Sequence, residues 1–169
     1  VNINGALSVD GDMVVTRPQY HVFDLLGNHT GSTLYGTEIY CDTFPVEEPL
    51  NPKMERPRPG NLTGSAEKGP KIFEVPELDA VATGDEGVCF VSLVNKSLEH
   101  DVEVEFYLNG GEAESVELST IYHDDVSAAN TAEEPDNVCI RSSKAYLEQE
   151  VIRMTAKKHS VNLLKIKLK

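Results

Sequence analysis

Two stretches near the middle of the chain place the strongest constraint on its fold. Residues 88–95 are a short run of mostly apolar side chains, and residues 102–108 alternate strictly between apolar and polar ones. Because successive residues of a strand point to opposite faces, strict alternation gathers the apolar side chains on one face. Lys96 and Ser97 fall in the turn after the first run, and Asn109 with two glycines ends the second. The pattern predicts two strands in succession.

Further short runs continue this pattern along most of the chain. Strands are expected at residues 72–76, 78–83, 116–122, 146–154 and 160–168, with a weaker one at 34–41. Strands of this length, separated by Gly, Asn and Pro, predict an all-β antiparallel sandwich. Residues 53–70 are rich in Pro and Gly and have no hydrophobic period, which predicts a flexible surface loop there.

The alternation also predicts which strand faces point to solvent. A single core that takes the apolar rows of two strands would leave the charged rows outside. The apolar rows are Val102, Val104, Phe106 and Leu164, Ile166, Leu168, and the charged rows are Asp101, Glu103, Glu105 and Lys165, Lys167, Lys169.

The first 30 residues follow a different pattern. A turn signal precedes the short apolar run at residues 13–15, and Pro18 then opens a helical spacing of apolar residues. These residues are Tyr20, Val22, Phe23 and Leu26, and Gly27 or Asn28 would end the helix. A strand followed directly by a helix is the repeating unit of a β/α barrel.

Charge and composition exclude several classes of partner. The chain has 15 Lys plus Arg against 28 Asp plus Glu, a formal charge of -13, which argues against nucleic acid. No apolar run approaches the ~20 residues of a membrane span, so no membrane partner is expected. Residues 97–140 contain no Lys or Arg, whereas lysines crowd the end of the chain. The sequence does not decide between a cytoplasmic and an exported protein, because any signal peptide would have been removed or would lie upstream of Val1.

No cofactor or metal site is expected. The three cysteines are too widely spaced for a zinc pattern, and Cys89 fits a buried thiol on a strand face. His123 has two carboxylates after it, from Asp124 and Asp125, and a surface turn is the better interpretation of that cluster. Three glycosylation sequons begin at Asn28, Asn61 and Asn95.

Three segments resemble one enzyme family in the same order along the chain. Residues 125–138 (DVSAANTAEEPDNV) are similar to the Asn-Thr loop near the C-terminus of family 51 α-L-arabinofuranosidases. Residues 12–23 resemble the segment that closes the catalytic barrel of that family, and residues 159–164 its final strand. The resemblance implies a jelly-roll sandwich over residues 31–169, preceded at 1–30 by a strand-helix remnant of the barrel.

The resemblance also implies what the chain does. The parent enzyme would release terminal α-L-arabinofuranosyl units from arabinose-containing polysaccharides or oligosaccharides, and it could form homo-oligomers, as that family often does. Its two catalytic Glu residues would lie on upstream barrel strands, so this chain would be a structural accessory without catalytic activity of its own. Its partner would be the barrel of the same polypeptide. Arg17, at the end of the last barrel strand, is the one candidate for the substrate rim, although a solvated strand end is the simpler interpretation.

A carbohydrate-binding module is the alternative from another functional class. Many such modules are β-sandwiches that present aromatic rings to sugars. The chain has no Trp, and its 6 Tyr and 5 Phe are dispersed. Tyr35, Tyr40 and Tyr107 could nevertheless share one face.

Overall fold

The computed structural model describes residues 5–47 and 72–169. It forms two compact units, one of Val1–Tyr40 with Leu78–Lys169 and one of Cys41–Glu77. In chain order, the first unit contains β1 (Leu7–Asp10), β2 (Met13–Thr16), α1 (Pro18–Gly27), β3 (Thr33–Tyr35), β6 (Leu78–Asp85), β7 (Val88–Asn95), β8 (Val102–Tyr107), β9 (Ala113–Ile121), β10 (Ile140–Ser143), β11 (Ala145–Glu148), β12 (Val151–Ala156) and β13 (Val161–Leu168).

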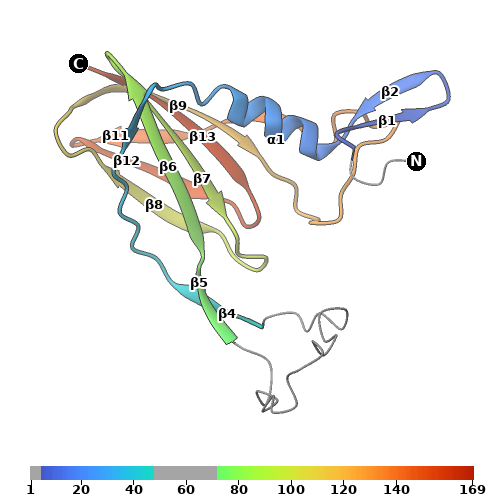
Figure 1. The fold of residues 1–169 in the computed structure, drawn as a ribbon, viewed down its shortest axis with the longest axis horizontal. Coiled ribbons are helices and arrows are strands. Elements are labelled where there is room, and N and C mark those ends of the chain that lie inside the picture. Colours follow the sequence, from blue (N-terminus) through green and yellow to red (C-terminus); the bar gives the residue numbers. More distant parts are fainter. Residues whose placement is uncertain (1–4, 48–71) are drawn as a thin grey trace, which may run out of the picture. The chain divides into compact units, whose positions relative to one another are not determined.

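The larger unit contains the predicted antiparallel sandwich (Figure 1). One sheet has six strands in the order β10-β9-β13-β7-β6-β3, and the other has three in the order β11-β12-β8. The best-buried apolar side chains come from both sheets and include Leu164 and Ile166 of β13 and Ile152 and Met154 of β12. Cys89 is a buried free thiol, as the sequence predicts.

The predicted strand faces are confirmed. Along β8 the apolar side chains are partly buried while the glutamates between them are exposed, and in β13 Leu164 and Ile166 are buried between exposed lysines. The two charged rows are not neighbours, because β8 pairs with β12 and β13 lies between β7 and β9.

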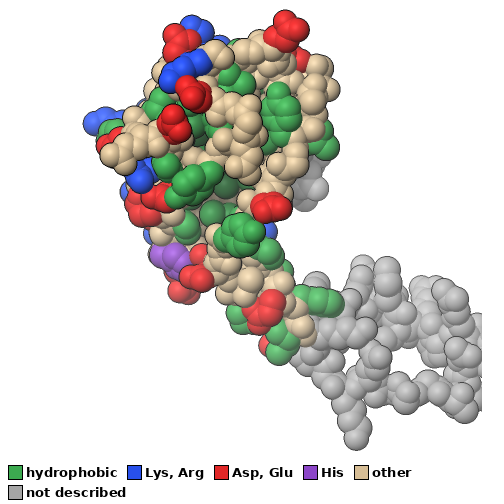
Figure 2. Space-filling model, turned by 90° about the vertical axis from the view of Figure 1, so that its left-hand side faces the viewer, with side chains coloured by type: hydrophobic (Ala, Val, Ile, Leu, Met, Phe, Trp, Pro, Cys, Tyr) green, Lys and Arg blue, Asp and Glu red, His purple; other side chains and the backbone are tan. Residues whose placement is uncertain are grey.

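The charged residues instead find partners on adjacent strands and loops. The C-terminal lysines pair with carboxylates of residues 97–140, the segment that has no Lys or Arg. Figure 2 shows acidic and basic side chains near one another on the face in view. Such exposed pairs contribute at most about 1 kcal/mol each. The pairs are Lys157 with Asp101, Lys167 with Glu114 and Lys169 with Glu112, and Arg153 pairs with Glu105.

The strand predicted at residues 146–154 is wrong, because the chain turns back within it. β11 and β12 form a hairpin whose two turn residues, Gln149 and Glu150, have φ of 50° and 69°. Two successive positive φ angles are typical of a type I′ turn, which usually has Asn-Gly at these positions. Gln and Glu carry no such signal. The weak strand at 34–41 is also shorter than predicted, since β3 ends at Tyr35.

The second unit contains one antiparallel hairpin, formed by β4 (Thr43–Glu47) and β5 (Ile72–Pro76). The Thr43 hydroxyl donates to the Glu74 carboxylate at 2.9 Å, and the Glu77 amide donates to the Asp42 carbonyl at 2.9 Å. The loop predicted at residues 53–70 lies outside the described residues.

The N-terminal strand and helix form where the sequence places them. β2 pairs antiparallel with β1 around a turn where Gly11 has a φ of 58°. Pro18 opens α1, and the Asn28 side chain donates to the Asp24 carbonyl at its end. Their assignment to the end of a β/α barrel stays a prediction. Within the part of the chain that is described, no helix is long and apolar enough to cross a membrane.

Helix α1 packs on the six-stranded sheet through residues that the helical pattern only partly identifies. Leu25 is buried in a cluster with Ile121, Val138 and Leu163, and Val22 packs against it. Tyr20, Phe23 and Leu26 are exposed. The packing side of the helix is therefore narrower than its apolar side.

We expect Leu25→Ala to lower the free energy of unfolding by about 2–5 kcal/mol, because it empties a site that is 2% exposed. Phe23→Ala removes a larger side chain from the same helix, but one that is 72% exposed, and should cost less than about 0.5 kcal/mol. Urea unfolding followed by circular dichroism checks both. Equal effects would mean that α1 does not pack in this orientation.

A buried polar network lies where β7, β9 and β13 meet the loop before β13. The Asn162 amide donates to the Leu93 carbonyl and the Ser160 hydroxyl, and its oxygen accepts from the Thr120 hydroxyl. The Asn95 side chain donates to the carbonyls of Ala156 and His100 and accepts from the Ser97 amide. Each polar atom of both buried carboxamides is thus hydrogen-bonded, as buried polar groups must be.

Candidate functional site

The Asn-Thr loop, residues 125–138, connects β9 to the segment before β10 and is held together by its own polar groups. The Asp125 carboxylate accepts from the Ser127 amide and hydroxyl, which lowers the pKa of Asp125. Thr131 and Glu134 exchange two hydrogen bonds, one through the threonine hydroxyl and one between backbone groups. The loop is therefore ordered without a regular element.

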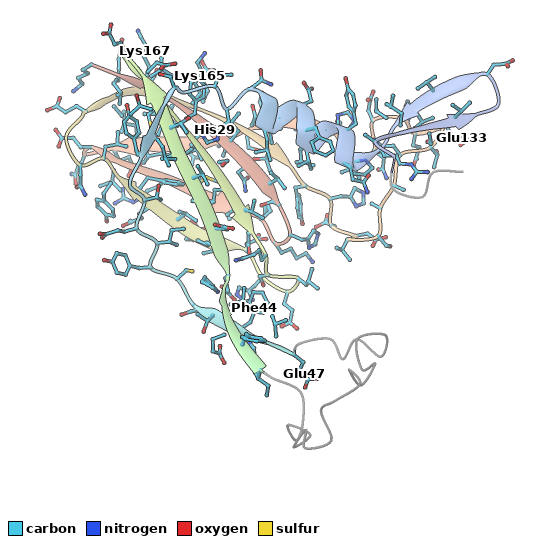
Figure 3. The ribbon with its side chains drawn as sticks, viewed as in Figure 1. His29, Phe44, Glu47, Glu133, Lys165 and Lys167 are labelled. Atoms are coloured by element: carbon cyan, nitrogen blue, oxygen red, sulfur yellow. The ribbon has the colours of Figure 1, made fainter. Side chains whose placement is uncertain are left out.

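Asn130 fastens this loop to the N-terminal segment. Its side chain is buried, accepts a hydrogen bond from the Val138 amide at 2.7 Å and donates to the Val138 carbonyl at 3.0 Å. Its second amide hydrogen reaches the carbonyl of Thr16, 114 positions earlier, at 2.8 Å. Figure 3 shows the part of the loop that bears Glu133 beside the β1–β2 hairpin.

Arg17 is the residue that follows this carbonyl. It precedes the first residue of α1 and is partly exposed, and its amide donates to the Ala6 carbonyl at 2.9 Å. Its own carbonyl accepts from the Tyr20 amide at 2.8 Å. The Thr16 hydroxyl lies 3.2 Å from Nε2 of His21. The peptide groups before and after Arg17 are thus both held by hydrogen bonds, through the Thr16 carbonyl, the Arg17 amide and the Arg17 carbonyl.

Sequence reasoning singled out Arg17 and the Asn-Thr loop separately, and the structure brings them together. No hydrophobic period could predict this contact, because it is made by one carboxamide across a separation of 114 residues. The available signal was chemical, since a buried Asn needs partners for all of its hydrogen-bonding atoms.

The cluster at His123 is a hydrogen-bonded turn. Nδ1 of His123 accepts from the Asp125 amide, and Nε2 of His159 donates to the His123 carbonyl at 2.7 Å. The Tyr122 ring stacks on His159, and its hydroxyl donates to Asp124, which raises the pKa of Tyr122 to about 12. In the described ranges, 5–47 and 72–169, no three His, Cys, Asp or Glu side chains converge as metal ligands.

A shallow depression of about 370 Å³ lies at the other end of β13. Lys165 and Lys167 line it together with Glu117 of β9 and Val88 of β7. The Asn-Thr loop leaves β9 beside Val161, at the start of β13, so the depression does not include Arg17. Figure 3 shows the two lysines at the end of the sandwich away from Glu133.

The tyrosines considered as a sugar platform lie apart. Tyr35 belongs to the six-stranded sheet and Tyr107 to the three-stranded sheet, while Tyr40 lies outside both. Tyr146 instead shares a face with Tyr107, because Tyr146, Arg153 and Glu105 form one row across β11, β12 and β8, and Tyr107 is two residues beyond Glu105. Both tyrosines are exposed on that outer face.

These features define an all-β sandwich domain that holds a preceding strand and helix in two ways, through the hydrogen bond from Asn130 to Thr16 and through the packing of Leu25 on the six-stranded sheet. Residues 1–160 match the family model described as the α-L-arabinofuranosidase C-terminal domain. The chain belongs to this family, which is the C-terminal domain of the glycoside hydrolase family 51 enzymes. The described residues contain no β/α barrel.

Solved structures of family 51 enzymes share the fold. The α-L-arabinofuranosidase of Thermotoga petrophila has a TM-score of 0.75 at 26% identity, over 96% of this chain and 31% of its own. The Thermotoga maritima enzyme, solved with arabinose, has a TM-score of 0.74 at 25% identity, over 97% and 32%. The arabinofuranosidase of Xanthomonas axonopodis pv. citri matches at a TM-score of 0.73 and 20% identity, over 96% and 28%.

The chain spans about a third of the length of these enzymes. No protein with a curated description matches it.

Proposed function

We propose that this chain is the accessory domain of a retaining α-L-arabinofuranosidase whose catalytic barrel belongs to the same polypeptide. The parent enzyme would release terminal α-L-arabinofuranosyl units from arabinose-containing glycans. The observation that carries the proposal is the family match over residues 1–160, supported by two Thermotoga enzymes of which this chain covers about a third. The association of the parent into homo-oligomers stays a prediction.

The chain by itself should not hydrolyse an aryl α-L-arabinofuranoside above the rate in buffer. A retaining glycosidase needs two carboxyl groups about 5 Å apart, one protonated and one ionised, and surface carboxylates are not tuned in this way. The release of the aryl alcohol, followed by absorbance, checks this with the barrel-containing parent as the positive control. Turnover by the purified 169-residue chain would overturn the proposal.

Arg17 is the residue of this chain that we place at the substrate rim. In the parent, Arg17→Ala should raise KM by about 10-fold with little change in kcat, because it removes a contact made equally to substrate and transition state. Arg17→Lys keeps the charge without the planar fork and should give an intermediate KM. An unchanged KM in both variants would make Arg17 a solvated strand end.

A second candidate function, glycan binding by the sandwich itself, is favoured by the exposed face that Tyr107 and Tyr146 share. Tyrosine rings can stack on sugar faces, and Arg153, held by Glu105 and Glu148, offers hydrogen bonds between them. Retardation of the chain in a gel containing arabinan, weakened in Tyr107→Ala but not in Tyr40→Ala, would support this function. Equal mobility with and without arabinan would exclude it.

A further inference from the structure

We infer that Asn130 is a positioning residue for the substrate rim, acting through the peptide unit between Thr16 and Arg17. The inference rests on the proposed role of Arg17. It adds a link between the sandwich and the substrate site, because the loop that bears Asn130 lies in the sandwich domain whereas Arg17 lies at the start of α1.

The geometry gives Asn130 direct control over that peptide unit. The Thr16 carbonyl and the Arg17 amide belong to the same planar peptide group, so fixing one side fixes the other. Asn130 holds the carbonyl at 2.8 Å, and the Ala6 carbonyl holds the amide at 2.9 Å. The orientation of the Arg17 Cα follows from these two hydrogen bonds and from the Tyr20 amide on its far side.

The chemistry of the site specifies a carboxamide. Two carbonyl oxygens, of Thr16 and Val138, need donors, and the Val138 amide needs an acceptor. Only Asn, among side chains of this size, supplies two donors and an acceptor. An Asp would place a carboxylate against both carbonyls, and an apolar residue would leave all three groups unpaired in a site that is 8% exposed.

A loop that merely closed on itself would not need the bond to Thr16. The two hydrogen bonds to Val138 already close residues 130–138, and Asn137 adds a bond from its side chain to the Ala129 carbonyl at 3.2 Å. The hydrogen bond from Asn130 to the Thr16 carbonyl is therefore the one that fixes the end of β2 relative to the sandwich. A shift of about 1 Å in a group that positions the substrate can lower kcat/KM by up to about 100-fold.

The first arm of the test uses the 169-residue chain and measures amide hydrogen exchange by NMR. Asn130→Ala should speed exchange of the Arg17 amide by at least 10-fold and leave the amides of Leu93 and Leu164 in the core strands protected. Asn137→Ala is the matched control from the same loop and should leave the Arg17 amide unchanged. Equal exchange in the wild type and Asn130→Ala, or equal acceleration by both variants, would overturn the inference.

The second arm measures kinetics in the barrel-containing parent. Asn130→Ala should raise KM for an aryl α-L-arabinofuranoside by about 10-fold with kcat within about 2-fold, and it should add nothing in an Arg17→Ala background. Asn137→Ala should change neither constant. Asn130→Gln keeps the amide one methylene out of place and should give a smaller rise in KM, which provides a folded variant if Asn130→Ala does not fold.

The outcomes separate the two hypotheses. If Arg17→Ala raises KM and the Asn130 variants do not, the inference is wrong while the role of Arg17 stands. An equal effect of Asn130→Ala with and without Arg17 would also overturn it, because the side chain would then act independently of Arg17. If Arg17→Ala leaves KM unchanged, the role of Arg17 at the rim fails first, and the inference fails with it.

Discussion

Asn162→Leu is expected to lower the free energy of unfolding by about 2–4 kcal/mol. Leucine matches asparagine in shape but leaves the Thr120 hydroxyl, the Leu93 carbonyl and the Ser160 hydroxyl without this partner in a site from which water is excluded. A stranded buried polar group costs about 1–3 kcal/mol, more than the net value of the hydrogen bond itself. Because a domain of this size has only about 5–15 kcal/mol of stability, the midpoint of urea unfolding should shift clearly.

A double-mutant cycle separates this cause from simple misfit. Thr120→Val removes the hydroxyl that Asn162→Leu strands, so the pair should be less destabilised than the sum of the single variants, by about 1 kcal/mol or more. Strict additivity of the two free-energy changes would show that poor packing of the introduced leucine, rather than an unpaired hydroxyl, causes the loss.

Gly31→Ala is expected to cost at least about 2 kcal/mol, or to open the edge of the six-stranded sheet. A Cβ at Gly31 would lie 2.2 Å from the Gly84 backbone nitrogen and 2.5 Å from the Thr83 hydroxyl. The nearest atom belongs to the backbone of β6, so relief requires the linker between α1 and β3 to move away from the sheet. His29, whose ring lies 6.3 Å from that of Phe90, would be displaced with it.

Gly36→Ala is the matched control five positions along the chain. A Cβ there would meet nothing within 4 Å, and Gly36 has no positive φ, so alanine should be neutral or stabilise by up to about 1 kcal/mol through the unfolded state. Thermal unfolding of both variants, with amide exchange of β6, checks the pair. Similar stabilities for Gly31→Ala and Gly36→Ala would mean that the linker does not approach Gly84 so closely.

The strands and the helix could largely be predicted from the sequence, because hydrophobic periodicity depends only on residues that are close together along the chain. The alternation in residues 102–108 predicted both β8 and the face it buries, and Pro18 predicted the start of α1. The hairpin at Gln149 and Glu150 was missed because its backbone requires positive φ, which these residues do not signal. The exposure of Phe23 could not be predicted, because a helical pattern shows that a side is apolar but not how much of it is covered.

The candidate site could be predicted only in part. The resemblance made Arg17 a candidate for the substrate rim, which stays a proposal, and it singled out the Asn-Thr loop, but it did not predict that the two segments are in contact. That contact depends on where two distant segments meet in space, and it is made by single atoms of Asn130 and Thr16. A pattern read along the chain carries no information on such a pairing, whereas the requirement that a buried carboxamide be satisfied indicates that some partner must exist.

The burial of Asn95 bears on the choice of cell for producing this protein. Asn95 begins a sequon, yet in the fold its amide nitrogen is buried and donates to the carbonyls of both Ala156 and His100. A secretory eukaryotic cell that attached an oligosaccharide to this nitrogen during synthesis would replace one of those hydrogens with a bulky, hydrated sugar. Such molecules could not close the sandwich between β7 and β12, whereas Asn28, exposed at the end of α1, could carry the same sugar without this conflict. Bacterial expression avoids glycosylation of Asn95. Ser97→Ala also removes the sequon, but it removes at the same time a hydroxyl that accepts hydrogen bonds from the Glu99 and His100 amides.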